Sequence, residues 1–380
     1  MKRILFLGLI ALFAASAAVA VQDKTEFRTI AGIPHAINPA KPLKGTITLE
    51  VERTRTINPY DQPDVGLRMI MFSRDAVGNV MLFDPNGAEG HRFDASDKYI
   101  GLVTKKGQGP GEFSPQQGYW ALFFDPGIWV FGGSKVAHFD ASGALLKERT
   151  LKNHFYAEAD ASHFFTVAVS WDAQKKQTRA LKIVAFDMEG AERVVDLLSA
   201  ENIGMIMNPN GQGGIGEGWA TPNFFYTADP GRQRIFCGLN QDYKIRVKDY
   251  AGKDLLVIER PCERAKIGRK DIDILIPWAA KEERLKWVFS AFPDRLAAIK
   301  DILPLPKGHL GVFRISGPKK TELDVFDAEG RYLYILLSPS DLRTDYLKFF
   351  SSGYATIEQD GDYSVYREYR IKNLPEIFGK

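Results

Sequence analysis

A five-residue motif recurs five times along the chain and constrains its fold more than any other feature. In most copies it reads Phe-Asp, two variable residues and Gly, and it lies between two short segments in which apolar and polar residues alternate. An Asp side chain bonds to the backbone of its own turn, and Gly accepts a positive φ, so the motif predicts a β-hairpin. The copies are residues 93–97, 139–143, 186–190, 248–252 and 326–330.

The spacing of the motif predicts a β-propeller. The Asp residues of its first three copies, Asp94, Asp140 and Asp187, are 46 and 47 residues apart. This is close to the length of a four-stranded propeller blade, about 40–50 residues. A second turn precedes four of the copies, so one unit holds four antiparallel strands. The expected blades are residues 65–113, 118–155, 160–200, 219–262, 299–338 and 342–373.

The sixth unit is too short for a fourth strand, and we expect the missing strand to come from the other end of the chain. Residues 46–57 alternate between apolar and polar and belong to no other unit. Pairing them with the last unit closes the ring and leaves no open sheet edge there. We therefore predict an all-β fold: a monomeric six-bladed β-propeller of four-stranded antiparallel blades, forming one domain over residues 46–375.

An insertion before the fifth blade is expected to be helical. It covers about residues 265–298, within the longest gap between two copies of the motif, and Leu285, Val288 and Phe289 recur at the spacing of one helix face. We expect a helix over residues 278–289 that packs on the side or mouth of the propeller. Binding of a partner protein through this helix is the alternative.

The first twenty residues have the features of a secretory signal peptide. A basic start precedes an apolar run over residues 4–13, and residues 18–20 read Ala-Val-Ala, which matches a cleavage site. The run is shorter than the roughly 20 residues that span a membrane, and no Cys follows it to carry a lipid. We expect residues 1–20 to be removed, an extended arm over residues 21–45, no membrane span in the mature chain, and a periplasmic or secreted protein.

The balance of charges excludes one class of partner. The chain carries 50 Lys and Arg and 47 Asp and Glu, a net charge of +3, with no long block of one sign. Nucleic acid is therefore not an expected partner.

Cys237 and Cys262 are the only cysteines. An oxidising compartment permits a disulfide, but a strand is expected to lie between them, which favours two separate, buried thiols.

The stretch KKGQGPGEF at residues 105–113 carries a family resemblance. It resembles the G-x-G-P-G-E-F/Y stretch that joins the first recognisable blade to the next in exported six-bladed propellers with NHL-like or TolB-like repeats. The resemblance covers roughly residues 46–373, but this loop is its one specific motif. It implies a propeller in the bacterial envelope and no particular reaction. The chain departs from the family pattern in the third unit, which has no clear Asp-Gly turn between its inner strands, and in a glycine-rich stretch over residues 208–219.

A structural role is favoured for residues 105–113. A phosphate-binding loop is disfavoured, because its lysine follows the glycines and leads into a helix, whereas in this chain two lysines come first and a strand is expected next. The composition suits a crossing from one blade to the next. The glycines allow tight turns, the proline stiffens the chain, and the phenylalanine can pack between the blades. Glu112 can accept hydrogen bonds from the amides of the loop. Those structural residues are Gly107, Gly109, Pro110, Gly111 and Phe113.

Ligand binding is the alternative role of the same loop. Crossing loops line the mouth of the channel, where propellers commonly bind ligands. A tryptophan that follows the glycine-rich stretch is a candidate for stacking on a sugar. The candidate ligand-binding residues are Lys105, Lys106, Gln108, Glu112 and Trp219.

A cation site is a further alternative, implied only by resemblance. Lactonase-like six-bladed propellers hold a divalent cation in the central channel with Glu, Asp and Asn oxygens, ligands that suit Ca²⁺. The residues of this chain that match this chemistry lie in and beside the glycine-rich stretch. They are Asn208, Asn210, Glu217 and Asn223. No cofactor other than Ca²⁺ is indicated.

These features favour an exported binding or scaffold module over an enzyme. The chain has no G-x-S-x-G motif and no metal-binding spacing among its His residues. A propeller fold alone does not specify a reaction. We expect the crossing-loop face to bind a small molecule, a glycan or an envelope protein. A metal-dependent hydrolase or lyase of the lactonase-like type is the alternative function.

Overall fold

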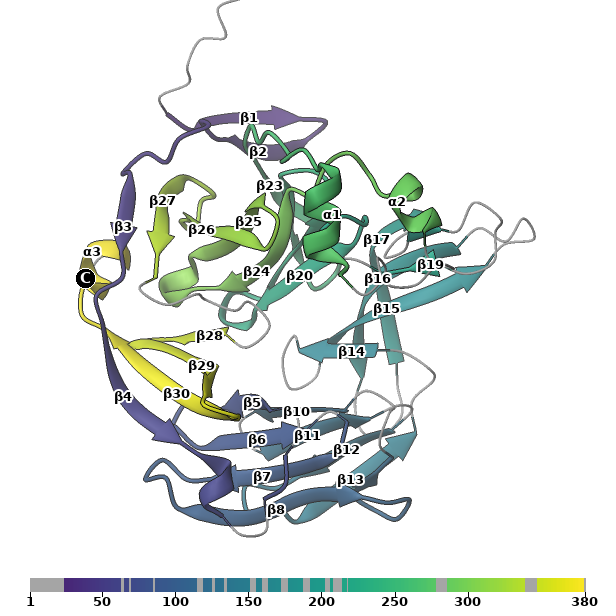
Figure 1. The fold of residues 1–380 in the computed structure, drawn as a ribbon, viewed down its shortest axis with the longest axis vertical. Coiled ribbons are helices and arrows are strands. Elements are labelled where there is room, and N and C mark those ends of the chain that lie inside the picture. The colour runs from purple at the N-terminus through teal and green to yellow at the C-terminus, as the bar shows by residue number, and fades with distance from the viewer. Residues whose placement is uncertain are drawn as a thin grey trace, which may run out of the picture.

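The computed structural model forms a ring of six β-sheet blades (Figure 1), which confirms the predicted six-bladed β-propeller. The inner strands surround the channel, and the outer strands form the rim. The residues that the structure describes are 24–62, 65–67, 70–84, 86–114, 119–124, 127–132, 135–150, 155–158, 163–171, 177–186, 192–201, 206–207, 214–216, 218–277, 286–338 and 347–378.

Each blade contains four antiparallel strands, which follow one another from the channel outward. Blade 1 is β5 (Met71–Arg74), β6 (Val80–Asp84), β7 (Glu89–Phe93) and β8 (Tyr99–Lys106), blade 2 is β10 (Tyr119–Phe124), β11 (Gly127–Gly132), β12 (Lys135–Phe139) and β13 (Leu145–Thr150), and blade 3 is β14 (Phe155–Glu158), β15 (His163–Trp171), β16 (Gln177–Phe186) and β17 (Glu192–Glu201).

Blades 4 to 6 continue the ring. They are β20 (Phe224–Asp229), β21 (Arg234–Leu239), β22 (Lys244–Asp249) and β23 (Asp254–Glu259), then β24 (Ile299–Pro304), β25 (Leu310–Gly317), β26 (Lys320–Phe326) and β27 (Tyr332–Leu337), then β28 (Leu347–Phe350), β29 (Gly353–Asp360), β30 (Tyr363–Ile371) and β4 (Val51–Ile57). Besides the strands of the N-terminal segment, three short strands add to these: β9 (Glu112–Phe113), which pairs in parallel with β8, and β18 (Ile206–Met207), which pairs with β19 (Gly214–Ile215).

The recurrent motif forms the turn between the third and fourth strands of a blade. In blade 2, Asp140 Oδ1 accepts hydrogen bonds from the N–H of Ser142 at 2.8 Å and of Ala144 at 2.9 Å. Gly143 has a φ of +91°, which disfavours a side chain at that position. The copy in the third unit lies mostly outside the described residues. In the other four units the predicted hairpin is confirmed.

The N-terminal segment runs along the rims of blades 4, 5 and 6 (Figure 1). The expected extended arm instead forms a hairpin of β1 (Glu26–Ile30) and β2 (Ile33–Ile37), because residues 31 and 32 adopt a tight turn, and β2 pairs in parallel with β23. The predicted closing strand is confirmed for β4, which pairs with β30. Residues 46–48 form a separate strand, β3 (Thr46–Thr48), that pairs with β27 of blade 5.

Two buried asparagines attach this N-terminal segment to the ring. Asn38 is 0% exposed, its Nδ2 donates to Gly330 O at 2.9 Å, and its Oδ1 accepts a hydrogen bond from Tyr332 N–H at 2.8 Å. Asn373 is also buried, and its Nδ2 donates to Thr48 O at 3.0 Å. These side chains satisfy backbone groups of segments far apart in sequence, and so fix the register of the N-terminal segment.

Apolar side chains pack between neighbouring blades and form the core. Between blades 1 and 2, Phe113 is 1% exposed and packs with Phe83, Ile128 and Phe139. Similar clusters lie between blades 3 and 4, 4 and 5, 5 and 6, and 6 and 1. Blades 2 and 3 meet through Phe164, whose ring contacts Trp129 and Phe131. Because each blade buries apolar surface against both neighbours, the ring holds its inner strands in fixed relative positions.

The described part of the insertion between blades 4 and 5 contains two short helices joined to irregular segments. It contains α1 (Arg269–Leu275) and α2 (Trp287–Ala291), which share one apolar cluster. Residues 278–285 lie outside the described residues, so only the end of the predicted helix falls within α2. The prediction missed α1, which begins where Asp271 Oδ2 accepts a hydrogen bond from Gly268 N–H at 2.7 Å.

The remaining helices among the described residues are short. They are α3 (Leu374–Phe378) and the 3₁₀ helices η1 (Pro59–Asp61), η2 (Pro230–Arg232) and η5 (Pro306–Gly308). No helix in the described part of the chain is long and apolar enough to cross a membrane.

Candidate functional site

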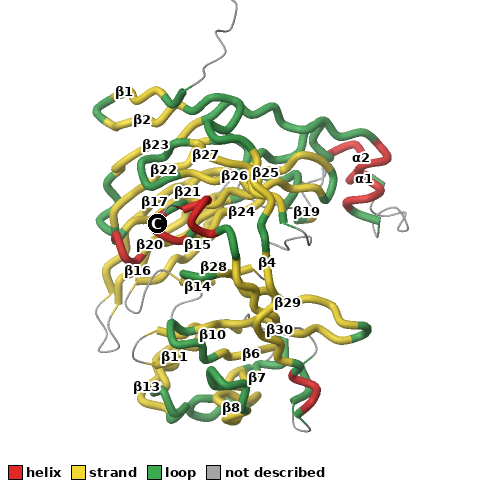
Figure 2. The backbone as a smooth tube through the Cα atoms, turned by 90° about the vertical axis from the view of Figure 1, so that its left-hand side faces the viewer, coloured by secondary structure: helices red, strands yellow, loops and turns green. Residues whose placement is uncertain are grey.

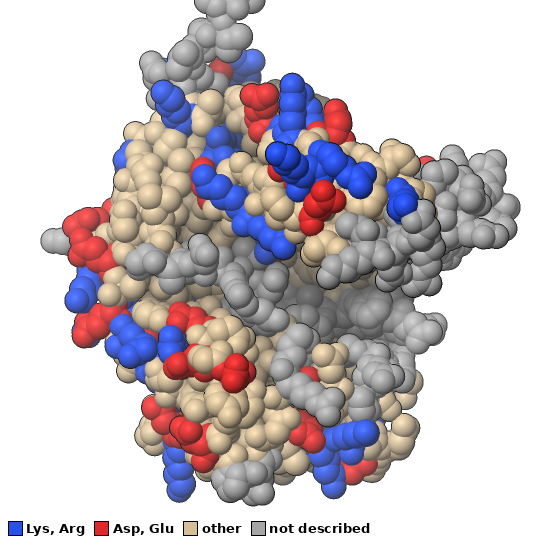
Figure 3. Space-filling model, in the orientation of Figure 1, with Lys and Arg blue, Asp and Glu red and all other residues tan. Residues whose placement is uncertain are grey.

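A cavity of about 590 Å³ lies in the channel and is the candidate site. It is lined by residues of four inner strands, β5, β20, β24 and β28, and of the turns that follow three of them. On the molecular face drawn in Figure 3, basic and acidic side chains are interspersed, with several Lys and Arg side chains near α1. The distribution of surface charge on that face therefore indicates no binding site. The channel is the better candidate, because a cavity lies there between several inner strands.

The cavity lies toward the end of the channel opposite to the crossing loops. A crossing segment enters each blade at the N-terminal end of its inner strand. The cavity instead contacts the C-terminal ends, such as Arg74 of β5 and Thr227 of β20, and the turn residues Asp75 and Pro230. The predicted site at the crossing-loop face therefore does not coincide with this cavity.

Arg74 is a cavity residue whose position is fixed by its neighbours. Its Nε donates to Glu368 Oε1 at 3.1 Å, and its Nη1 donates to Asp75 O at 2.9 Å. Its guanidinium lies over the ring of Phe350, 4.2 Å from the centroid. A guanidinium held by an acid and an aromatic ring keeps its charge and presents it in one orientation.

Asp301 places a carboxylate in the wall of the same cavity. The register of β24 against β25 shifts between Ile299 and Asp301, and Asp301 Oδ1 accepts a hydrogen bond from Ile302 N–H at 2.8 Å. Burial first, and then the Asp301 charge, raise the pKa of Tyr226 to about 12. The cavity thus has an acidic group on blade 5 and a basic group on blade 1.

The loop that the sequence singles out is a compact turn. Glu112 Oε2 accepts a hydrogen bond from Gly109 N–H at 2.9 Å, and Glu112 Oε1 lies 3.2 Å from Lys105 Nζ. The Gly109 N–H first, and then the Lys105 ammonium, lower the pKa of the Glu112 carboxyl below its ordinary value. Gly107 N–H donates to Phe113 O at 3.0 Å and closes the turn.

Blade 2 holds this turn at the rim of the ring. Lys135 Nζ donates to Gly109 O at 3.0 Å and to Glu112 O at 2.9 Å, and Glu148 Oε2 accepts a hydrogen bond from Gly111 N–H at 2.7 Å. Lys135 and Glu148 belong to the two outer strands of the blade, β12 and β13. The turn is therefore packed away from the channel cavity.

Three candidate ligand-binding residues of the loop, Lys105, Lys106 and Gln108, are exposed at this rim. Lys105 and Lys106 are the last residues of the outer strand β8, and Gln108 Nε2 donates to Ser114 Oγ at 2.9 Å. None of these residues lines the described cavity. The structure brings them together with Glu112 but does not bring them together with Arg74 or Asp301.

Substituting Gly107 with Ala should destabilise the turn. A Cβ at this position would lie 1.9 Å from Glu112 Oε2, so the carboxylate must move and lose its bond to Gly109. We expect a loss of about 1–3 kcal/mol in the free energy of unfolding, measured by urea denaturation. Gly66→Ala is the matched control, since a Cβ there meets nothing within 4 Å. Equal stability of both variants would contradict the packing described.

Trp219 lies apart from the cavity and packs on the helical insertion. Its side chain is partly buried with the α1 and α2 cluster, and its carbonyl accepts a hydrogen bond from Ala297 N–H at 2.7 Å. Lys300 Nζ lies 5.1 Å from its ring centroid. One face of the ring is therefore occupied by a cation rather than presented as a free stacking surface.

The proposed cation ligands are only partly described. Asn208, Asn210 and Glu217 lie outside the described residues. Asn223 has an exposed side chain whose Oδ1 accepts a hydrogen bond from Phe224 N–H at 2.9 Å. Among the described residues, no group of three or more His, Cys, Asp and Glu side chains is arranged to hold a metal ion.

The two cysteines are not joined by a disulfide, as predicted. Cys237 is buried, and its burial raises the pKa of its thiol to about 12. Cys262 is only partly buried, which corrects the expectation of two buried thiols, because it lies just beyond the end of β23. Neither thiol is a reactive thiolate near neutral pH.

Sequence reasoning missed the cavity residues Arg74, Thr227, Asp301 and Lys348. They lie on four different blades and share no motif. The sequence offers one signal for such residues, which is their location on an inner strand. Once the inner strands are assigned, the charged and hydroxyl residues on them are candidates for the channel wall.

Comparisons with known proteins assign no family to this chain. No family model matches the chain, and no curated protein matches it. Similar solved structures include a Bacteroides fragilis protein described as exported (TM-score 0.45, 12% identity, 85% of this chain and 95% of that chain), virginiamycin B lyase from Staphylococcus aureus (0.44, 10%, 85% and 100%) and the calcium-binding protein regucalcin from Agrobacterium tumefaciens (0.36, 10%, 87% and 97%). No conclusion about function rests on these similarities.

Proposed function

We propose that this chain is an exported binding module that holds a small molecule in the channel of its propeller. One observation carries the proposal: a cavity of about 590 Å³ is lined by the inner strands of blade 1 and of blades 4 to 6, which the closed ring brings together. That volume lies within the range of small-molecule sites, about 300–1,000 Å³. A closed ring is a rigid support for such a site, because every blade is packed on two neighbours.

The cavity wall indicates the chemistry of the ligand. Arg74 and Asp301 supply opposite charges from two blades, and Thr227 supplies a hydroxyl. Phe349 and Leu303 supply apolar surface between these polar groups. We infer a ligand with both polar and apolar parts, such as a short peptide or a sugar derivative, oriented by charge-assisted hydrogen bonds.

Export is the second part of the proposal. It rests on the signal-peptide features of residues 1–20 and on the sequence resemblance to exported propellers. N-terminal sequencing of the protein recovered from the periplasm or the medium tests it. We expect Val21 as the first residue, and a cytoplasmic chain that retains residue 1 would contradict export.

A cavity-filling variant tests the binding site. Thermal denaturation with a panel of short peptides, amino acids and oligosaccharides should reveal ligands that raise Tm, since a ligand at about 100 times its Kd stabilises by about 2.7 kcal/mol. Thr227→Trp fills the cavity and should abolish that rise. Ser199→Trp, at an exposed position of the outer strand β17, should leave it intact.

The outcomes separate the possible functions. A ligand that raises the Tm of both tryptophan variants equally would contradict binding in the channel. The same series with CaCl₂ and with EDTA tests the lactonase-like alternative, because a resident divalent ion raises Tm when present and lowers it when chelated. A calcium-dependent Tm together with hydrolysis of a lactone would replace the binding module by that enzyme.

A further inference from the structure

The hairpin β1–β2 gives blade 4 an exposed edge. The sheet runs in the order β1-β2-β23-β22-β21-β20, so β1 has a neighbour on one side only within the described chain. The hairpin lies at the periphery of the ring in both views (Figures 1 and 2). Phe27 and Ile30 of β1 are 51% and 46% exposed. An open edge with exposed apolar side chains is a surface on which another strand can pair.

The turn of the hairpin determines which backbone groups of β1 face outward. Ala31 and Gly32 have φ of +50° and +81°, and Ile30 pairs with Ile33, which describes a two-residue type I′ turn. In such a hairpin the closing pair is hydrogen-bonded, and bonded and non-bonded pairs then alternate. Glu26, Arg28 and Ile30 therefore bond toward β2, and the N–H and C=O of Phe27 and Thr29 point away from it.

A proline supports this assignment independently. Pro34 of β2 lies opposite Thr29. Because proline has no N–H, it fits only where the strand pair makes no hydrogen bond. Thr29 therefore belongs to a non-bonded pair of the hairpin, and its backbone groups are directed to the open edge.

The charges of β1 match those of a second β1 strand in one antiparallel register. When Phe27 lies opposite Phe27 of a second copy, Glu26 of each copy lies opposite Arg28 of the other. In the structure, Glu26 and Arg28 lie on one face of the strand and form an ion pair at 2.6 Å. The register centred on Arg28 would also pair the outward backbone groups of Phe27 and Thr29, but it would face Arg28 with Arg28 and would place no cation opposite Glu26. Of these two registers, only the one centred on Phe27 is complementary in both backbone and charge.

Phe27 is held in place for such a contact. The guanidinium of Arg331 lies 5.5 Å from the centroid of its ring. In the register centred on Phe27, the two Phe27 side chains meet on the face opposite to the ion pairs, since neighbouring strand residues point to opposite faces. One face then carries an aromatic pair, and the other carries two ion pairs.

We propose that the β1 edge is a dimer interface that joins two copies of this chain by antiparallel strand pairing about a two-fold axis at Phe27. The contact extends blade 4 of one copy into blade 4 of the other. This differs from the monomer expected from the sequence, in which residues 21–45 belong to no sheet. Because a five-residue strand buries less than the roughly 1,000 Å² of a stable interface, the dimer is weak and reversible.

Charge variants of the exposed strand test the proposal. Sedimentation velocity of the chain from Val21 onward, over a wide range of concentrations, should show a monomer–dimer equilibrium. Glu26→Arg leaves two positive residues on each strand, and Arg28→Glu leaves two negative ones. Each variant should weaken self-association by about tenfold or more, because two unlike pairs become two like pairs. Lys253→Glu, an exposed change in the β22–β23 turn, should leave self-association unchanged.

Mixing the two variants gives the decisive result. Glu26→Arg and Arg28→Glu proteins should be monomeric alone and should form a heterodimer together, which loss of folding cannot imitate. Thr29→Pro removes an outward N–H without removing a bond to β2, and should also abolish the dimer. The proposal would be overturned by a chain that stays monomeric at all concentrations, or by a dimer whose stability these substitutions do not change. It would also be overturned if the two variants did not associate when mixed. Capture of an extended peptide by a chain that never pairs with itself would overturn it too.

Discussion

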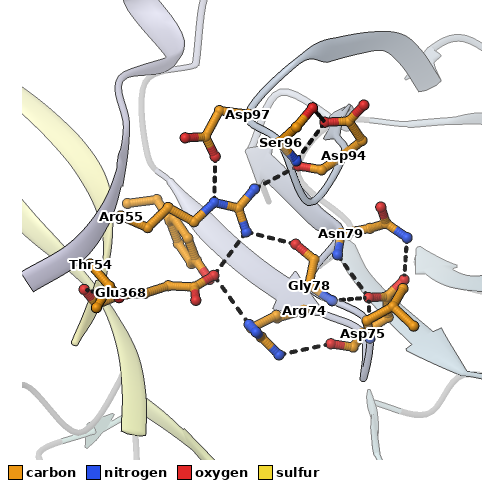
Figure 4. A network of polar contacts seen from close by, with 12 residues as sticks. Thr54, Arg55, Arg74, Asp75, Gly78, Asn79, Asp94, Ser96, Asp97 and Glu368 are labelled. Carbon is orange, nitrogen blue, oxygen red and sulfur yellow. Dashed lines mark hydrogen bonds and ion pairs between the residues drawn. The ribbon is translucent and has the colours of Figure 1, made fainter. Parts of the chain in front are cut away.

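Replacing Arg55 with Ala should lower the free energy of unfolding by about 3 kcal/mol. Arg55 lies on the closing strand β4, and its side chain is 9% exposed. Its Nη1 donates to Glu368 Oε1 at 2.9 Å in blade 6 and to Gly78 O at 2.6 Å in blade 1, and its Nη2 donates to Asp94 O at 2.6 Å (Figure 4). One side chain therefore joins the two blades that meet where the ring closes.

The cost follows from what remains buried when Arg55 is removed. Glu368 is 8% exposed and keeps Arg74 and the hydroxyl of Tyr366 as partners, so its charge is only partly compensated. This places the effect near the lower end of the range for breaking a buried ion pair, about 3–5 kcal/mol. Arg53→Ala is the matched control because Arg53 is an exposed residue of the same strand, and it should cost less than about 0.5 kcal/mol. Equal urea midpoints for both variants would contradict this role.

The same network should make stability depend on pH in the acidic range. Burial of Glu368 raises its pKa, but the hydrogen bonds from Tyr366 and Arg74 and the nearby charges outweigh burial and hold the pKa below its ordinary value of 4.5. A carboxyl with a lowered pKa in the folded state stabilises the fold above its unfolded pKa, and this stabilisation is lost as the pH falls through the folded pKa. Glu368→Gln should be less stable at neutral pH and should lose less stability on acidification below about 4.5.

The recurrent turn was predictable because its geometry depends on residues that are adjacent in the chain. Asp140 and Gly143 form their turn through contacts that span four residues or fewer. Asp97 shows the limit of this reasoning. It occupies the Gly position of the motif with a φ of +70°, and its carboxylate binds Arg55. That partner lies in the closing strand, so the motif alone could not explain why an Asp stands there.

The candidate site was less predictable for the same physical reason. The bond from Gly109 to Glu112 is local and follows from the loop sequence, whereas the position of the loop depends on Lys135 and Glu148 of the next blade. The cavity is lined by four inner strands, and which residues line it depends on how these strands are positioned along the channel axis relative to one another. Neither periodicity nor spacing in the sequence defines those positions. The sequence therefore could not show that Arg74 and Asp301 line the same cavity.

Replacing Asp324 with Ala should destabilise the fold more than any of the substitutions above, by about 4 kcal/mol. Asp324 lies on β26 and is 0% exposed. Its Oδ2 accepts hydrogen bonds from Arg260 Nη1 at 2.7 Å and from Tyr243 OH at 2.7 Å, both of blade 4 or the segment that follows it. Its Oδ1 accepts a hydrogen bond from Tyr332 OH at 2.8 Å. Burial and the Asp324 charge raise the pKa of Tyr332 above its ordinary value, so the hydroxyl remains a donor.

The large effect of this substitution comes from the two arginines that it leaves behind, since Arg314 Nε also donates to Asp324 Oδ2, at 3.1 Å. Arg260 has a side chain that is 7% exposed and keeps only Ala40 O as a described acceptor, at 2.8 Å, while Arg314 keeps Glu322. When a buried arginine loses its carboxylate partner, no ion pair offsets the free energy of removing its charge from water. Asp324→Asn keeps oxygen acceptors but not the charge and should cost about half as much. Asp242→Ala, an exposed change in blade 4, should be near neutral. An Asp324→Ala protein with the urea midpoint of the Asp242→Ala control would show that this network does not hold blades 4 and 5 together.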